Sequence, residues 1–391
     1  MADRNVVPLE ASTTSGRARK LTADRLAELA SWNRPPCVSI YVPLDPVRGD
    51  ATRIRLKDLA RTARNELERL GAAGRLIDEL LTPVTALEGR FGEASGHRGI
   101  AMFTAPGIHV ACWLGADLPA RADAGKRFVV TPLVAALPAN RRYHLLALSQ
   151  HDVRLFRGNH AGLSPVEVGG MPRNVAEALW YEDPDRRVSW HGGAQVGRGR
   201  VAMIAHGSGS ERDVHSDRLL RFFRAVDDSV ATVLHAPTAP LLVAGVDYEL
   251  AFYRQATRVA SIVTVSLGNT DLLSAAELQD RCQPAIRTLL DRPRVARLRR
   301  LARLGAPATS LPEVLAACAE SRVDTLFVRA DALTWGAADG DGSDAHEQRV
   351  DGDVELYGVA IGAALRRGAT VFPAWPGELP GDAPIAASLR F

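Results

Sequence analysis

Apolar residues recur at helical spacing near the start of the chain and as short strand-like runs after it. Six positions fall three or four residues apart and predict one buried stripe on a helix over residues 50–70: Leu56, Leu59, Ala60, Ala63, Leu67 and Leu70. Thr22 is placed to cap a short helix ending before Pro35-Pro36. A further helix is predicted over residues 76–91, with strands at 37–42, 99–103, 108–114 and 128–132. These elements predict a first α/β domain over residues 21–140, behind a polar lead-in of residues 1–20 that we expect to be disordered.

The same patterns divide the remaining chain into two further α/β domains. A middle domain is predicted over residues 141–265, with strands at 143–148, 153–157 and 240–246 and helices at 213–234 and 248–257. Its residues 159–210 are rich in glycine and predict a long loop, which is usually functional or disordered. The third domain, residues 266–391, opens with a helical stretch over 271–304 in which Pro284 and Pro293 are candidate breaks. Ser310 then caps a helix, and strands and a helix alternate to the end.

Composition excludes several classes of protein. No run of about 18 apolar residues occurs, so no membrane span is predicted, and the N-terminal segment lacks the apolar core of a secretory signal. Cys37, Cys112, Cys282 and Cys318 stand far apart without a C-x-x-C motif, which argues against a disulfide framework or a cysteine zinc site. We therefore expect a cytoplasmic protein without a membrane partner.

Charge is unevenly distributed along the chain, although the net charge is only +3. The first 140 residues are net positive, whereas the segment after residue 303 is strongly acidic. Arg53, Lys57, Arg61 and Arg64 recur at spacings of four, four and three, so they share one face of the predicted helix, opposite the leucine stripe. Such a cationic face could follow RNA phosphates with strong salt dependence. The alternative is a solvated helix face, since Asp58, Glu66 and Glu68 dilute the charge.

The long loop carries the most distinctive local pattern. Gly192 and Gly193 give the backbone freedom to approach a ligand closely, and Gln195 follows after Ala194. Residues that could contact RNA flank this group: Trp190, His191, Arg198 and Arg200. The alternative is a flexible surface loop whose arginines are merely solvated.

Other motifs give no enzyme signature. The chain contains no H-E-x-x-H, no Walker A motif and no G-x-G-x-x-G opening a helix. Residues 339–350 lack the glycine and the bidentate glutamate of a calcium loop. The sequence therefore predicts no cofactor and no metal site. A basic run over residues 292–303 has three candidate partners: RNA, an acidic protein surface, or the acidic remainder of its own domain.

The order of these elements and several segments resemble the release factor and Pelota superfamily, in particular the bacterial archaeo-eukaryotic release factor families, with family 3 the nearest. The resemblance is carried by residues 39–46 and 53–59, by 144–156 and 315–328, and by the ending 384–391. It implies three consecutive α/β domains: an N-terminal release-factor-like domain, a middle ribonuclease-H-like domain and a C-terminal α/β/α ribosomal-protein-like sandwich.

The resemblance also implies a function in translation. It favours a ribosome-associated factor that binds the vacant A site, the tRNA site, in rescue or hibernation, with a translation GTPase such as elongation factor Tu docking on the C-terminal domain. An alternative is peptidyl-tRNA hydrolysis, with Gly192, Gly193 and Gln195 as the catalytic tip. The extra Ala194 would displace the glutamine by up to ~3.5 Å, and a misplacement of ~1 Å can cost about 100-fold in rate. A third reading is a stress-related RNA- or protein-binding module that does not act on ribosomes.

Overall fold

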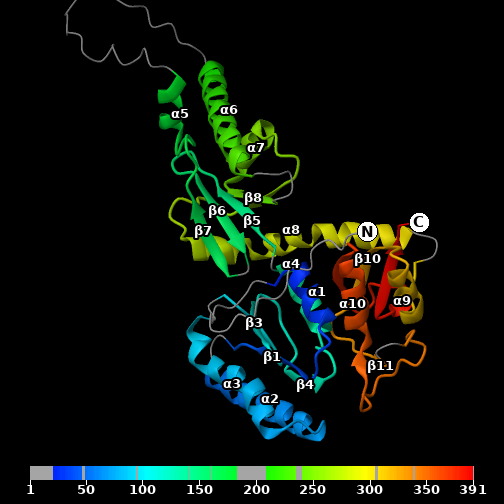
Figure 1. Ribbon diagram of the computed structural model, residues 1–391. Coiled ribbons are helices and arrows are strands. Elements are labelled where there is room, and N and C mark those ends of the chain that lie inside the picture. The colour runs from blue at the N-terminus through cyan, green and yellow to red at the C-terminus, as the bar shows by residue number, and fades with distance from the viewer. Residues whose placement is uncertain are drawn as a thin grey trace, which may run out of the picture. The chain divides into compact units, whose positions relative to one another are not determined.

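The computed structural model describes residues 21–45, 49–93, 96–139, 141–159, 161–182, 208–234, 240–303, 307–337 and 340–390. It is a mixed α/β protein with several sheets (Figure 1). Two compact units share the chain: unit 1 comprises Met1–Arg141 with Asp291–Phe391, and unit 2 comprises Arg142–Leu290. Within the described chain no helix is both long and apolar enough to cross a membrane.

The N-terminal part of unit 1 is built on a four-stranded antiparallel sheet of order β3-β2-β1-β4. Its strands are β1 (Cys37–Pro43), β2 (Gly99–Ala105), β3 (Ile108–Leu114) and β4 (Arg121–Gly125). One face is covered by α2 (Gly49–Arg69), α3 (Gly74–Thr85) and the 3₁₀ helix η1 (Ala86–Glu93). The predicted stripe on α2 is buried at Leu56, Leu59, Ala63 and Leu67, whereas Leu70 is exposed. Strand alternation then turns Tyr41 and Phe103 to the opposite face.

The C-terminal part of unit 1 contains a three-stranded sheet of order β13-β10-β14. The strands are β10 (Val323–Arg329), β13 (Thr370–Ala374) and β14 (Ile385–Leu389). A separate two-stranded antiparallel sheet is formed by β11 (Trp335–Gly336) and β12 (Val354–Glu355). Two helices, α9 (Leu311–Ala319) and α10 (Leu356–Arg366), pack against the sheet. Ser310 is the N-cap residue of α9, as predicted, and the structure adds a capping box with Glu313 as its partner. Short helical turns complete the unit: η2 (Thr131–Ala135), α4 (Ala136–Ala139) and η4 (Pro380–Asp382).

The two parts of unit 1 share one hydrophobic core. Helix α1 (Ala23–Ser31), capped by Thr22 as predicted, packs against α10. A Cβ atom on Gly362 of α10 would lie 2.8 Å from the Cβ of Ala30, so the absence of a side chain lets the helices approach this closely. Residues from both ends of the chain, among them Leu26, Phe103, Val314 and Ile361, belong to a single buried cluster. The three-domain division expected from the sequence stays a prediction, to which the structure adds this common core.

Unit 2 contains a five-stranded mixed sheet of order β7-β6-β5-β8-β9. Its strands are β5 (Tyr143–Ala147), β6 (Arg154–Asn159), β7 (Gly162–Val166), β8 (Leu241–Gly245) and β9 (Ile262–Ser266). The first three are antiparallel neighbours, and β8 and β9 run parallel to β5. Helices α5 (Val175–Glu182), α6 (Ser208–Val233) and α7 (Asp247–Ala256) belong to this unit, with α6 and α7 on one face of the sheet. The first half of α8 (Ala275–Arg303) covers the other face.

The structure differs from the sequence-based expectations at several elements. Residues 128–132 are buried without forming a strand, because side chains satisfy the Val129 backbone: its N–H donates to the Ser39 Oγ at 3.0 Å, and its carbonyl accepts from the Tyr41 hydroxyl at 2.5 Å. The fourth strand is β4 instead, whose small residues give little hydrophobic signal. The 159–210 segment contains β7, α5 and the start of α6, and so is not one continuous loop. Helix α8 continues through both Pro284 and Pro293.

Candidate nucleic-acid interface

The predicted cationic face of α2 is present and exposed. The side chains of Arg53, Lys57, Arg61 and Arg64 are 54%, 63%, 71% and 42% exposed, respectively. They lie on the side of the helix away from the buried stripe, as the spacing predicted. Ile54, 62% exposed, is a large apolar side chain on the same helix. The helix therefore presents a row of four cations to solvent.

Each of these cations has a carboxylate partner. Arg53 and Arg61 pair with the acid three residues before them, Asp50 and Asp58, at 3.2 Å in both cases. Lys57 lies 3.7 Å from Glu88 of η1, and Arg64 lies 2.7 Å from Asp78 of α3. The last two acids come from neighbouring helices, so the helical periodicity of α2 could not reveal them. Exposed pairs of this kind contribute only about 0–1 kcal/mol, so a phosphate could displace these carboxylates at little cost.

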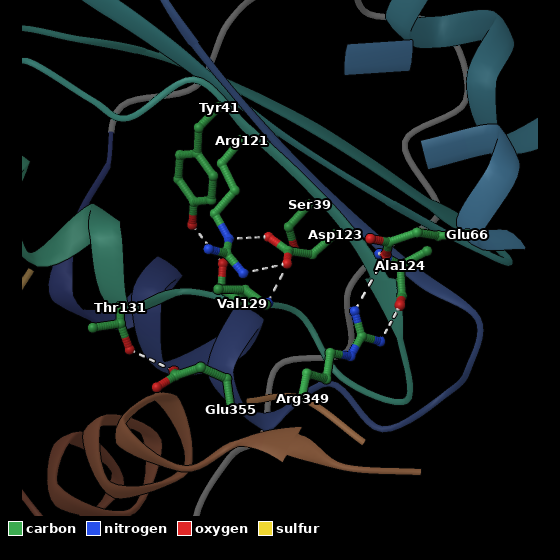
Figure 2. A network of polar contacts seen from close by, with 10 residues as sticks. All are labelled: Ser39, Tyr41, Glu66, Arg121, Asp123, Ala124, Val129, Thr131, Arg349 and Glu355. Atoms are coloured by element: carbon green, nitrogen blue, oxygen red, sulfur yellow. Dashed lines mark hydrogen bonds and ion pairs between the residues drawn. The ribbon is translucent and has the colours of Figure 1, made fainter. Parts of the chain in front are cut away.

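A polar network holds the inner side of α2 to the rest of unit 1 (Figure 2). The Glu66 carboxylate accepts a hydrogen bond from the Ala124 N–H of β4 at 2.6 Å and pairs with Arg349 at 3.2 Å. Arg349 also donates to the Ala124 carbonyl. Because Arg349 lies 283 residues beyond Glu66, this network ties α2 to the C-terminal part of the same unit.

Beside this network lies an open pocket of about 390 Å³. Arg121 forms a two-bond pair with Asp123, at 2.5 and 2.6 Å, and its guanidinium carbon lies 5.8 Å from the Trp335 ring centroid. Arg349 lies over the same ring at 5.0 Å. Three arginines and three acids line the pocket together with Leu333 and Trp335: Arg69, Arg121, Arg349, Glu66, Asp123 and Glu347. Because these charges balance and both stacked guanidinium groups are already paired, the pocket offers no excess charge to a ligand.

Glu355 is a fully buried carboxyl group of unit 1 whose pKa is strongly raised. Burial raises its pKa to about 7, although it accepts hydrogen bonds from the Thr131 hydroxyl at 2.5 Å and from the Gly358 N–H at 2.7 Å. It also caps α10 through the Tyr357 N–H. Figure 2 shows the Thr131–Glu355 hydrogen bond together with the Arg121–Asp123 pair. The position of Glu355 at a helix start, inside the shared core, indicates a structural role.

Neither metal ligation nor thiol chemistry is supported by the described residues. Among them, no group of three or more His, Cys, Asp or Glu side chains could hold a metal ion. All four cysteines are buried and free. Burial raises the pKa of Cys37 to about 12 and that of Cys112, Cys282 and Cys318 to about 11, so these thiols are protonated at neutral pH and are poor nucleophiles.

The other predicted site residues belong to the segment between α5 and α6. The catalytic tip, Gly192, Gly193 and Gln195, lies outside the described residues. The same holds for the flanking RNA-contact residues Trp190, His191, Arg198 and Arg200. The described part of the predicted site is therefore the cationic face of α2.

Comparison with known proteins finds a family match in the middle of the chain. Residues 142–322 match the model of "Bacterial archaeo-eukaryotic release factor family 3", which confirms the predicted resemblance over that range. No curated protein matches the chain.

Three solved structures illustrate the wider similarity. An archaeal translation termination factor, aRF1, is 13% identical, with 95% of this chain and 99% of that chain covered at a TM-score of 0.21. A ribosome-bound archaeal Pelota, from a model that also includes ABCE1, is 15% identical, with coverages of 73% and 72% at a TM-score of 0.36. The Archaeoglobus fulgidus Pelota is 15% identical, with coverages of 73% and 75% at a TM-score of 0.31.

Proposed function

We propose that this protein, whose residues 142–322 match the model of a bacterial release-factor-like family, binds the vacant A site of the ribosome in rescue or hibernation. The family match is the observation that carries the proposal. The protein acts by occupying the site, and the cations of α2 contact ribosomal RNA. A translation GTPase such as elongation factor Tu delivers it through the C-terminal segment of the chain.

Two structural observations support this proposal. The sheet of unit 2 has its first three strands antiparallel and its last two parallel to the first, in the order third-second-first-fourth-fifth. That arrangement is the one expected of the ribonuclease-H-like middle domain. The exposed face of α2 provides four cations whose carboxylate partners are held only weakly. Release of counterions from RNA would then drive binding at low salt.

The test is co-sedimentation of the full chain with vacant bacterial ribosomes across a salt series, with and without elongation factor Tu. Wild-type protein is expected to pellet saturably, and a variant with Arg53, Lys57, Arg61 and Arg64 all changed to Glu is expected to stay in the supernatant. If wild-type protein does not pellet even at low salt, with or without the GTPase, the proposal is wrong.

A matched control separates charge from stability. Changing the four partners, Asp50, Asp58, Asp78 and Glu88, to Asn or Gln breaks the same ion pairs but keeps every cation. This variant is expected to bind at least as tightly as wild type, because the cations lose their competing carboxylates. Equal loss of binding in both variants would mean that the ion pairs themselves, and not the positive charge, matter.

The sequence of residues 190–200 favours one second candidate, hydrolysis of peptidyl-tRNA on the ribosome. Gly192 and Gly193 precede Gln195 with one intervening alanine, and such a tip could position water while backbone N–H groups stabilise the developing oxyanion. Turnover on ribosomes loaded with peptidyl-tRNA that disappears in Gln195→Ala, while binding persists, would establish this activity. Absence of turnover in a wild-type protein that binds would leave occupancy as the function.

A further inference from the structure

A second group of cations lies in unit 1, where the C-terminal end of α10 approaches the end of α1. Its members come from three separate segments, and we call them the α10 arginine cluster: Arg127, Arg366, Arg367 and Arg390. The Arg366 guanidinium donates to the Ser31 hydroxyl at the end of α1. Arg367 donates to the Ser321 hydroxyl at 2.9 Å, and Arg390 donates to the Arg367 carbonyl at 3.0 Å. Three of the four side chains are exposed, and Arg127 is half-buried.

The cluster differs from the face of α2 in its partners. Within the described parts of the chain, none of its four guanidinium groups has a carboxylate within ion-pair distance, and Arg366, Arg367 and Arg390 donate to hydroxyl or carbonyl oxygens. Nearby Arg322, by contrast, pairs with Glu320 at 2.5 Å. The surface therefore keeps its positive charge, whereas the charge of α2 is matched by acids.

The electrostatics of Arg366 show that these like charges act on one another. Its pKa is lowered below the usual arginine value, first by burial and then by the positive charges of Arg367 and Arg127. The ends of α1 and α10 compensate only in part, because each helix C-terminus carries roughly half a negative charge. About three of the four positive charges thus remain to attract an anion.

We propose that the α10 arginine cluster is a binding surface for the phosphodiester backbone of RNA. The proposal rests on the proposed function for its source of RNA, since a factor inside the ribosome is surrounded by ribosomal RNA. Planar guanidinium groups suit this task because each can donate two parallel hydrogen bonds to one phosphate. Arg127, Arg367 and Arg390 make the phosphate contacts, and Arg366, anchored on Ser31, holds the ends of α1 and α10 together beneath them.

The test measures the salt dependence of binding to a single-stranded oligouridine and to vacant ribosomes. The variant changes Arg127, Arg367 and Arg390 to Gln and leaves Arg366 in place. A control of equal charge changes Arg75, Arg98 and Arg258 to Gln, three exposed arginines elsewhere on the chain. Losing three phosphate contacts on single-stranded RNA should reduce the slope of log K against log salt concentration by about 2. The control should keep the wild-type slope, and thermal unfolding of both variants monitors their folding.

The outcomes separate this inference from the proposed function. If the cluster variant keeps the wild-type slope, or loses no more than the control, the inference is wrong, even when wild-type protein pellets with ribosomes. Binding to polyglutamate is measured in parallel as a probe for an acidic protein partner. If the variant loses affinity for polyglutamate but not for oligouridine, an acidic protein is the partner and the inference is also wrong. If oligouridine binding depends on the cluster while wild-type protein ignores ribosomes, the RNA surface stands and the A-site proposal falls.

Discussion

Glu355 gives a quantitative prediction about how the stability of unit 1 depends on pH. Burial raises its pKa from 4.5 to about 7, so the folded state holds a proton that the unfolded chain releases between these two values. The contribution of this bound proton to the free energy of unfolding is fully present below about pH 4.5 and is lost as pH rises through about 7. A difference of this size corresponds to about 3 kcal/mol. Deprotonation of this one carboxyl should therefore destabilise unit 1 by that order at alkaline pH.

The informative perturbation is Glu355→Gln, which cannot ionise. Tyr357 donates to Oε1 and Gly358 to Oε2 of Glu355, so the carbonyl oxygen of glutamine replaces only one of these acceptors, and this loss is the same at every pH. The free energy of unfolding of each protein is measured with urea between about pH 4 and pH 8. Tryptophan fluorescence reports mainly on unit 1, which contains four of the chain's six tryptophans, at positions 32, 113, 335 and 375. From the low to the high end of that pH range, the free energy of unfolding of the variant should rise relative to that of wild type by about 3 kcal/mol.

A second variant tests the cause of the shift. Thr131→Val removes the hydroxyl that donates to Glu355 at 2.5 Å, and this bond favours the charged carboxylate. Its loss should raise the pKa of Glu355 further and move the transition to higher pH. If wild type and Glu355→Gln share one pH dependence, Glu355 does not titrate in this window and the reasoning fails.

Three further substitutions test other contacts. Gly362→Leu forces a side chain against Ala30, and the overpacking should cost about 1–3 kcal/mol in urea unfolding, so unchanged stability would contradict the close approach of α1 and α10. Tyr253→Phe removes a hydroxyl that donates to the buried Asp227 at 2.9 Å. Hydrogen exchange of α7 should show that the free energy of opening falls by about 1.5–3 kcal/mol, and an unaltered exchange rate would argue against this hydrogen bond. Arg349→Met removes the guanidinium that pairs with Glu66 and should increase protease sensitivity near α2, whereas wild-type resistance would show that the network does not hold the helix.

Local patterns were sufficient where an element is stabilised by its own residues. The leucine and alanine stripe of α2 and the caps at Thr22 and Ser310 depend on residues a few positions apart. The structure contains both caps and buries the stripe at Leu56, Leu59, Ala63 and Leu67, although Leu70 is exposed. The outward placement of the α2 cations follows from the same periodicity. Spacing in the sequence therefore determined which face of this helix meets solvent.

Tertiary packing decided the elements that the patterns missed. Residues 128–132 have the composition of a strand, yet hydroxyl groups of β1 satisfy the Val129 backbone and make strand pairing unnecessary. Helix α8 passes Pro284 although an internal proline costs about 3 kcal/mol. Its buried contacts at Leu278, Cys282 and Ile286 offset that cost. This stabilisation comes from packing against the sheet of unit 2, whose strands lie elsewhere in the sequence than the residues around Pro284.

The surface charge shows the same division. The sequence by itself determined that Arg53, Lys57, Arg61 and Arg64 share a face, because three or four residues complete a helical turn. Only the tertiary structure decided that these cations are paired, since Asp78 and Glu88 reach them from other helices. Only folding brings Arg127 near Arg366, far away in the chain. Charges act through space, and distances in space between separate segments are set by how the core packs.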